Sequence, residues 1–407
     1  MPKSTGLSSL TMTSLSEANS KFGFRLFREL KQNAEDNLIM SPLSVSAVMA
    51  MVLYGAREKT AFQMQKVLHL DEVTEGSKPS VGDSRGKSSE AVCGKPGEIH
   101  SQFHALLEEI NRPNDDYSLS IANRLYGSQT FQFLQPYLDA VKNIYQAGLE
   151  AMDFLHASEE SRGKINSWVE NQTNGKIKEL FSAGTIDPAT VLVLANAIYF
   201  KGQWAMKFKE ENTQETNFRT NKDTNRPVQM MKQTGFFNMG YMEESQGKIL
   251  ELPYTNKHLS MFVLLPTDAD GLEKLEQDLT FEKLLELMNP ENMALKEVNV
   301  CFPRFRVEET YSLRPTLEAM GMTDIFDTQS ADFSGMTTHR GLAVSKIIHK
   351  AYVEVNEEGT EAAAATGIVI GYNSSRKEEF NCDHPFLFLI RHNKSNSILF
   401  YGRVAAP

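Results

Sequence analysis

One short segment near the C-terminal end restricts the possible folds more than any other part of this chain. Residues 357–377 read Glu-Glu-Gly-Thr-Glu-Ala-Ala-Ala-Ala-Thr-Gly-Ile-Val-Ile-Gly-Tyr-Asn-Ser-Ser-Arg-Lys. The run of alanines favours a helix, but Gly359 and Gly367 bracket it, and the branched residues after Gly367 favour a strand. The segment therefore has no single preferred local structure, and its surroundings must decide which one it adopts.

A period of two divides this segment into the two faces of a strand. One face holds Thr360, Ala362, Ala364, Thr366, Ile368 and Ile370, and the other holds Glu361, Ala363, Ala365, Gly367, Val369 and Gly371. Glu361 carries the only charge between Gly359 and Tyr372. Such a strand can enter the middle of a sheet with its first face on the core, because the single charge then points to solvent. A surface linker of small residues fits the segment alone just as well.

Helical patterns come first along the chain and strand patterns come later. Ser14-Leu15-Ser16-Glu17 has the form of a capping box before an amphipathic run, and Ser41-Pro42 predicts the start of a buried helix. Residues 191–200 and 259–265 are short apolar runs typical of strands, and the end of the chain has the pattern of a hairpin. Because helices and strands do not alternate regularly, the order predicts an α+β fold rather than a parallel doubly wound sheet.

A polar stretch interrupts the helical patterns. Residues 71–98 are dominated by Gly, Ser, Pro and charged residues, which predicts a disordered loop between two helices. Helical spacing resumes at Ile99, so we expect one domain over residues 12–407 rather than two. Residues 1–11 form an unpatterned extension, and Met12 is a second candidate for the start of the folded protein. A protein that binds a partner through residues 71–98 is an alternative function.

Charge and composition exclude several classes of protein. The net charge of −10 argues against a nucleic-acid-binding surface, which needs clustered lysine and arginine. No apolar run reaches the roughly 18 residues that a membrane span requires. The first residues also lack the apolar stretch of a secretory signal. We therefore expect a cytoplasmic protein that binds neither nucleic acid nor membrane, with release to the extracellular space without a signal peptide left open.

Motifs of enzymes and metal sites are absent from the sequence. The chain contains no G-x-S-x-G, H-E-x-x-H, phosphate-loop or dinucleotide-binding signature. Asp383-His384 pairs an acid with a base and serines are plentiful, but neighbours in sequence need not share a site. His100 and His104 share a helix spacing, but no third ligand is nearby in the sequence. Cys93, Cys301 and Cys382 fit neither a zinc site nor a disulfide framework, so we expect free thiols. No catalysis, cofactor or metal is expected.

Three separate motifs resemble the serpins. Residues 196–204, Asn-Ala-Ile-Tyr-Phe-Lys-Gly-Gln-Trp, are similar to the central signature of that family. Residues 345–350 leading to 357–364 resemble its hinge, and residues 383–388, Asp-His-Pro-Phe-Leu-Phe, resemble its C-terminal strand entry. The likeness spans residues 14–407 apart from the polar insertion. The absent signal and the insertion after the third helix are similar to the ovalbumin-type (clade B) branch, from which Cys382 and Ala406-Pro407 are small departures.

The resemblance implies an α+β serpin fold with a large central mixed sheet, smaller sheets, a helical cluster and an exposed reactive-centre loop at residues 357–380. It implies a single-use inhibitor rather than an enzyme. A target protease cleaves the loop, and the freed part inserts into the central sheet while the acyl-enzyme is trapped. The implied partner is a serine or papain-like cysteine endopeptidase, and the protein is expected to be a monomer. A non-inhibitory serpin that serves in storage or interaction is the alternative.

The resemblance also assigns roles to individual residues of this sequence. It places Ser41, Ser44, Asn196 and His349 in a polar cluster under the sheet that must part, and Trp204 where the loop first enters. The hinge comprises Glu358, Gly359, Thr360, Glu361, Ala362, Ala363, Ala364 and Ala365. The family's spacing from the hinge puts the cleaved bond at Asn373-Ser374, with Tyr372-Asn373 and Arg376-Lys377 left open as alternatives.

Overall fold

Helices occupy most of the N-terminal part of the chain, and strands occupy most of the rest. The computed structural model describes residues 13–34, 36–74, 96–358 and 376–407. The helices are α1 (Ser14–Lys31), α2 (Pro42–Gly55), α3 (Glu58–Val67), α4 (Pro96–Ile110), α5 (Gln135–Tyr145), α6 (Ser158–Gln172), α7 (Leu272–Asp278), α8 (Phe281–Met288) and α9 (Arg314–Ala319). None of the helices in these described ranges is long and apolar enough to span a membrane.

The strands form two sheets. Five of them make the central sheet, in the order β10 (Phe305–Ser312), β11 (Lys346–Val355), β4 (Leu192–Gly202), β2 (Tyr117–Ser128) and β3 (Leu149–Met152). The second sheet runs β1 (Leu38–Met40), β14 (Ser397–Val404), β13 (Phe386–His392), β8 (Leu259–Pro266), β7 (Gly247–Pro253), β6 (Asn225–Tyr241), β9 (Ala294–Pro303) and β12 (Glu378–Asn381), with β5 (Gln214–Arg219) paired to β6. The layout confirms the predicted α+β class.

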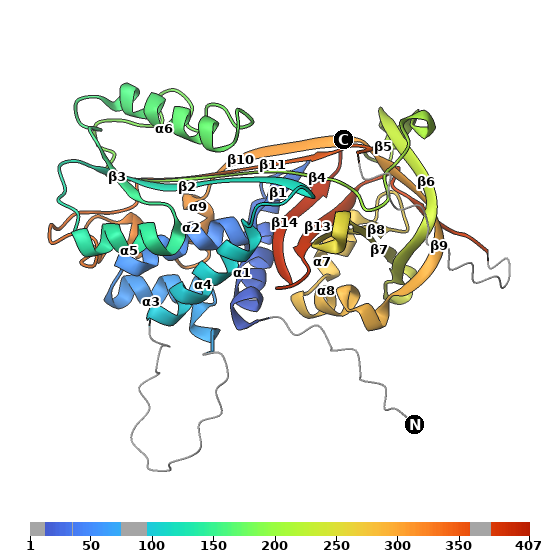
Figure 1. The fold of residues 1–407 in the computed structure, drawn as a ribbon, viewed down its shortest axis with the longest axis horizontal. Helices are drawn as coiled ribbons and strands as arrows, with labels where there is room; N and C mark the ends of the chain where they lie inside the picture. The colour runs from blue at the N-terminus through green and yellow to red at the C-terminus, as the bar shows by residue number, and fades with distance from the viewer. Residues whose placement is uncertain (1–12, 35, 75–95, 359–375) are drawn as a thin grey trace, which may run out of the picture.

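The central sheet is mixed and covered on both sides. β4 runs parallel to β11 and antiparallel to β2. Figure 1 shows α6 on one face of this sheet and the other N-terminal helices on the opposite face. Apart from Lys201, every residue of β4 is buried, which is why its sequence is apolar, except for Asn196 and Lys201, instead of alternating.

The sequence prediction needs three corrections at the ends of elements. Thr13, not Ser14, caps α1, because its side chain accepts the Ser16 N–H at 3.2 Å. The loop expected over residues 71–98 is shorter at both ends, since Leu70–Glu72 is a 3-10 turn and α4 already begins at Pro96. The loop expected over residues 357–380 overlaps β12, which begins at Glu378 because its backbone pairs with β9 and Phe380 is buried. Residues 1–11 and 75–95 lie outside the described residues.

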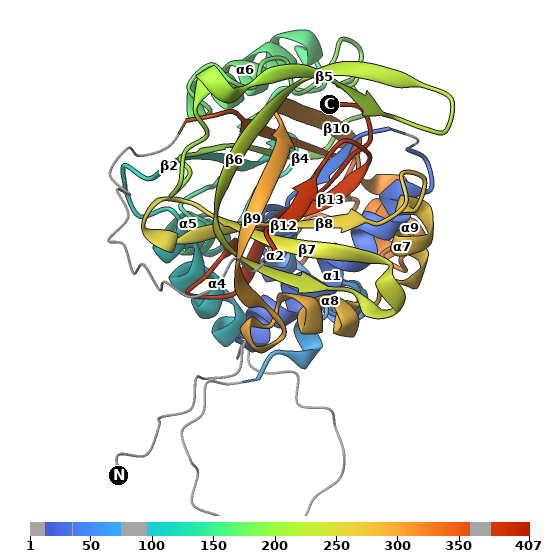
Figure 2. The same cartoon turned by 90° about the vertical axis from the view of Figure 1, so that its right-hand side faces the viewer.

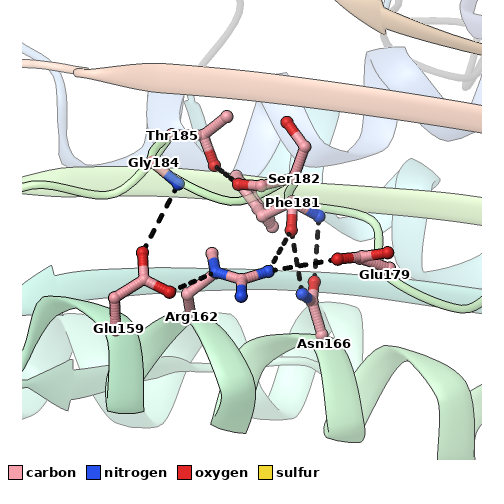
Figure 3. Close-up of polar contacts among 8 residues, drawn as sticks. All are labelled: Glu159, Arg162, Asn166, Glu179, Phe181, Ser182, Gly184 and Thr185. Atoms are coloured by element: carbon pink, nitrogen blue, oxygen red, sulfur yellow. Dashed lines mark hydrogen bonds and ion pairs between the residues drawn. The ribbon is translucent and has the colours of Figure 1, made fainter.

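A group of polar contacts fastens the segment after α6 back onto that helix (Figure 3). The Asn166 side chain donates to the Phe181 carbonyl oxygen and accepts the Phe181 N–H, both at 2.9 Å. Arg162 donates to the same carbonyl at 3.0 Å and pairs with Glu159. These contacts hold Phe181, which is fully buried, against the outer face of the central sheet. The return segment and α6 therefore cover the sheet as one unit.

Replacing Asn166 with alanine tests this fastening. We expect Asn166→Ala to lower the free energy of unfolding by about 1–3 kcal/mol, because the buried Phe181 N–H loses its partner. Urea unfolding measures the difference. Lys164→Ala is the matched control, since Lys164 lies on the same helix and its ion pair is with the exposed Glu160. Equal effects of the two substitutions would show that the Asn166 contacts do not hold the segment.

Candidate functional site

The contact between β4 and β11 is the part of the fold on which the expected site residues converge. The two strands pair in parallel from Lys346 beside Val193 to Glu354 beside Lys201. We call this contact the seam. Its core face points to α2, and its outer face lies under α6 and the segment that follows it.

A polar cluster bridges the seam on its core face. His349 of β11 and Asn196 of β4 are directly paired in the sheet, and their side chains are hydrogen-bonded through His349 Nδ1 and Asn196 Oδ1. Asn196 Nδ2 then donates to Ser44 Oγ at 2.8 Å and to the Ser44 carbonyl oxygen at 3.0 Å. Ser41 N–H points at His349 Nε2 at 3.1 Å. The structure thus brings together the four residues that the resemblance places under the sheet.

These contacts determine the protonation of His349. The Ser41 N–H can only donate, so His349 Nε2 must be the acceptor and the ring proton must lie on Nδ1. Nδ1–H then donates to Asn196 Oδ1, which leaves the Asn196 amide protons for Ser44 and for Asn123 Oδ1 of β2. A second ring proton on Nε2 would face the Ser41 N–H. The cluster therefore accepts only the neutral histidine.

Burial also favours the neutral form of His349. The side chain is fully buried, and this lowers the pKa of its ring to about 3 from the ordinary value of 6.5. Tyr311 of β10 stacks on the ring with centroids 6.3 Å apart. Its hydroxyl accepts the Ile39 N–H at 3.2 Å, which ties the cluster to β1.

The helix α2 supplies the serines through its own N-terminus. Ser41 is the N-cap residue, and its hydroxyl accepts the Ser44 N–H at 3.2 Å, with Pro42 in the first turn. The start of α2 at Ser41-Pro42 confirms the prediction from sequence. Because α2 is buried nearly all round, its first turn is held directly beneath the seam.

Trp204 sits where β4 ends and holds the chain that leaves β11. Its ring stacks on Tyr254, with centroids 4.5 Å apart and planes 8° apart, and its indole N–H donates to the Asn356 carbonyl oxygen at 2.8 Å. The Trp204 backbone N–H donates to the Glu358 carbonyl oxygen at 3.1 Å. Gly202 is required here, because a Cβ at that position would lie 2.4 Å from the Tyr254 ring.

Glu357 anchors the same segment by its carboxylate. It accepts hydrogen bonds from Arg304 Nε at 3.1 Å and from the Thr213 hydroxyl at 2.7 Å, and its side chain is buried. Burial by itself raises the pKa of this carboxyl group. The hydrogen bonds from Arg304 and Thr213 outweigh that effect, so the pKa of Glu357 lies below its ordinary value. The next residue, Glu358, forms an ion pair with Lys201 of β4 at 3.0 Å.

Some expected site residues cannot be placed. Gly359, Thr360, Glu361 and residues 362–365 of the hinge lie outside the described residues, as do Asn373 and Ser374 of the expected cleaved bond. Of the hinge, Glu358 is described. Sequence reasoning missed Asn123, which contacts Asn196, and Tyr254, which stacks on Trp204. It also missed Arg304 and Thr213, which bind Glu357 next to the hinge.

The residues weighed for catalysis or metal binding have structural contacts instead. One ring nitrogen of His384 is hydrogen-bonded to Asp383 at 2.8 Å, and the other is hydrogen-bonded to the Pro266 carbonyl oxygen at 2.6 Å. His100 contacts the Tyr145 hydroxyl and His104 contacts the Ile144 carbonyl oxygen. Cys301 and Cys382 are free, and Cys93 lies outside the described residues. Within the described ranges no three His, Cys, Asp or Glu side chains are grouped to hold a metal ion.

Comparison with known proteins adds three findings. A family profile described as "Serpin (serine protease inhibitor)" matches residues 17–407. Human Serpin B4 is 54% identical over 398 residues, which cover 97% of this chain and 100% of that protein. Uncleaved ovalbumin, 40% identical, matches the fold with a TM-score of 0.86, and a loop-inserted, cleaved ovalbumin mutant, also 40% identical, matches with 0.82; each match covers 97% of this chain and 100% of the other.

The buried His349 predicts a specific dependence of stability on pH. Its pKa is about 3 in the folded protein and about 6.5 when unfolded, so its contribution is complete above pH 6.5 and is lost as the pH falls toward 3. Relative to a His349→Gln variant, we expect the wild-type protein to lose about 2 kcal/mol of unfolding free energy between pH 7 and pH 5. Urea unfolding at the two pH values measures this.

The exposed His156 offers a matched control. A His156→Gln variant should follow the wild-type protein at both pH values. If the difference in unfolding free energy between the wild-type protein and His349→Gln is the same at pH 7 and pH 5, the prediction that His349 is buried in its neutral form is wrong.

Proposed function

The chain belongs to the serpin family and has clade B relatives, and on this basis we propose that it inhibits an endopeptidase by trapping it. In this proposal the endopeptidase cleaves the reactive-centre loop of residues 357–380, and the N-terminal part of the cut loop enters the seam between β4 and β11. The protein is consumed in one such event and turns over no substrate. The observation that carries the proposal is the parallel pairing of β4 and β11 immediately before the loop.

The direction of these strands matters because the loop follows β11 directly. A chain that turns back from the end of β11 runs antiparallel to it, and therefore antiparallel to β4 as well. Its insertion replaces one parallel ladder by two antiparallel ladders, which are the more stable kind per residue. Residues 360–370 are eleven in number, against eleven in β4 and ten in β11. The segment therefore has the length of the strands it would join.

The two faces of that segment suit the two sides of the seam. Thr360, Ala362 and the later even-numbered residues would meet the core face, where Ile368 and Ile370 add apolar burial. Ala363, Ala365 and Gly367 would lie on the outer face beneath α6 and its return segment. Small side chains are needed there because Ala195, Ala197 and Ile348 already pack against that cover.

We propose that the polar cluster keeps the seam closed before cleavage. A strand entering the seam separates β4 from β11 by one further strand spacing, about 4.8 Å. The direct hydrogen bond between His349 and Asn196 does not survive that separation. In this role the cluster of Ser41, Ser44, Asn196 and His349 opposes insertion, and Trp204 and Glu357 hold the turn from which insertion begins.

The position of β12 counts against Arg376-Lys377 among the three candidate bonds. A protease binds its substrate as an extended chain on both sides of the cut. Arg376-Lys377 lies immediately before β12, whose backbone is paired to β9 from Glu378 onward. Tyr372-Asn373 and Asn373-Ser374 both lie further from that strand in the sequence, and the family's spacing from the hinge favours Asn373-Ser374 of the two. Asparagine before the bond suits an asparagine-directed or broad papain-like cysteine protease, and a serine protease remains an equal candidate class.

Incubation with trypsin, chymotrypsin, elastase, papain and an asparagine-directed cysteine protease tests the proposal. We expect at least one covalent complex that survives a denaturing gel. Thr360→Arg should turn the protein into a plain substrate of that protease, because the arginine would be buried without a partner on the core face. Thr360→Ser is the control, since it keeps a small uncharged side chain on the core face and should still trap the protease. A Thr360→Arg protein that still traps protease contradicts the hinge argument.

Cleavage should also raise the thermal stability of the protein. We expect limited cleavage of the loop to raise the unfolding temperature by well over 10 °C, because the inserted strand replaces one parallel ladder of the central sheet by two antiparallel ladders. Scanning calorimetry of intact and cleaved samples measures the shift. A non-inhibitory serpin of the storage or interaction type would show no such increase, and an unchanged temperature would exclude insertion.

A further inference from the structure

Large apolar side chains are exposed at the end of the molecule that carries β12. Phe236 of β6 is 61% exposed and Leu295 of β9 is 67% exposed. Phe236 is paired with Glu297 and Asn238 with Leu295, so the two apolar side chains share a face as diagonal neighbours. We call Phe236 and Leu295 the β6–β9 patch. Figure 2 shows the three strands β6, β9 and β12 side by side.

The patch lies close to the proposed cleaved bond. Lys377, the residue before β12, contacts Glu297 at 3.7 Å, and Glu297 lies directly across from Phe236. Three adjacent chains spaced by about 4.8 Å place the Phe236 backbone about 10 Å from that of Lys377. Lys377 is three residues from Ser374, so their Cα atoms are within about 10 Å of each other.

The patch is within the reach of a protease bound at this bond. A specific interface covers roughly 800 Å² on each partner, an area about 30 Å across. The few residues that enter a protease cleft cover only part of such an area, so a protease of this size also contacts the strands that adjoin the loop. The β6–β9 patch is on the side of the residues that follow the cut.

The chemistry around the patch indicates an uncharged contact. Lys377 pairs with Glu297, and Asn299 donates to Glu379 at 2.7 Å and accepts the Thr234 hydroxyl at 2.6 Å. The polar neighbours therefore satisfy one another and leave the apolar pair as the part of this face that gains most from burial.

We propose that the β6–β9 patch is a secondary docking surface for the target endopeptidase. The β6–β9 patch contacts an apolar area on the protease. That area lies next to the part of the protease cleft that binds the residues after the cleaved bond. This inference rests on the proposed function. It adds a determinant of specificity outside the loop, so two proteases that cleave the same loop sequence are trapped at different rates.

The test is a double variant, Phe236→Ser with Leu295→Ser, combined with the protease that forms the covalent complex. We expect the second-order rate constant of complex formation to fall about tenfold, because a weaker encounter complex dissociates before cleavage more often. The number of inhibitor molecules used per protease should not change, since the loop and the seam are intact. Cleavage of a free peptide of residues 367–379 gives the rate that the loop sequence supports without the patch.

Two further variants separate docking from general surface effects. Phe62→Ser removes an aromatic side chain that is 56% exposed on α3, at the other end of the molecule from β9 (Figure 1), and should leave the rate unchanged. Phe236→Leu keeps an apolar side chain and should retain most of the rate. Equal rates for the wild-type protein and the double variant would overturn the inference.

Failure of the proposed function gives a different result. If the wild-type protein is cleaved by the protease without being trapped, the inhibitor proposal fails. The cleavage rate of the intact protein then replaces the trapping rate in the same comparison. A tenfold slower cleavage of the double variant would still support the docking surface, and an unchanged cleavage rate would reject it.

Discussion

The parallel contact between β4 and β11 is the constraint on which the rest of this molecule depends. Its hydrogen-bonded ladder joins the two halves of the central sheet. On the core face, His349 and Asn196 add a side-chain bridge across the same line, and α2 presents its first turn to that bridge. Both a backbone ladder and a buried polar network must therefore be broken before the sheet can part. A purely apolar seam of the same shape would offer no such all-or-none barrier.

The polar cluster shows how a buried hydrogen-bonded network can hold the sheet in its closed state, even where apolar side chains of the same volume would be more stable. Each member has one satisfactory arrangement. The Ser41 N–H donates to neutral His349, His349 donates to Asn196, and Asn196 donates to Ser44 and Asn123. Buried groups that lose such partners become costly, whereas apolar neighbours tolerate small shifts. The network therefore penalises partial opening strongly.

Much of this arrangement follows from sequence, and the rest depends on distant pairing. The order of helices before strands, the start of α2 at Ser41-Pro42 and the C-terminal hairpin are local patterns, and the structure confirms them. The contacts of Asn123 and Arg304 are not local. Asn123 faces Asn196 because β2 and β4 pair in one register, and Arg304 reaches Glu357 from 53 residues away. No propensity or spacing in a single sequence encodes such a register.

The two faces of the seam put opposite demands on any strand that enters it. The core face accepts apolar side chains only after the His349 bridge has parted, while the outer face is already filled by the cover of α6 and its return segment. That cover is fastened through Phe181 by Asn166 and Arg162, so it does not peel away residue by residue. A strand can pass beneath it only if its outward side chains are small. Positions 363, 365 and 367 of the proposed strand are alanine, alanine and glycine, which meets this demand in the middle of the segment.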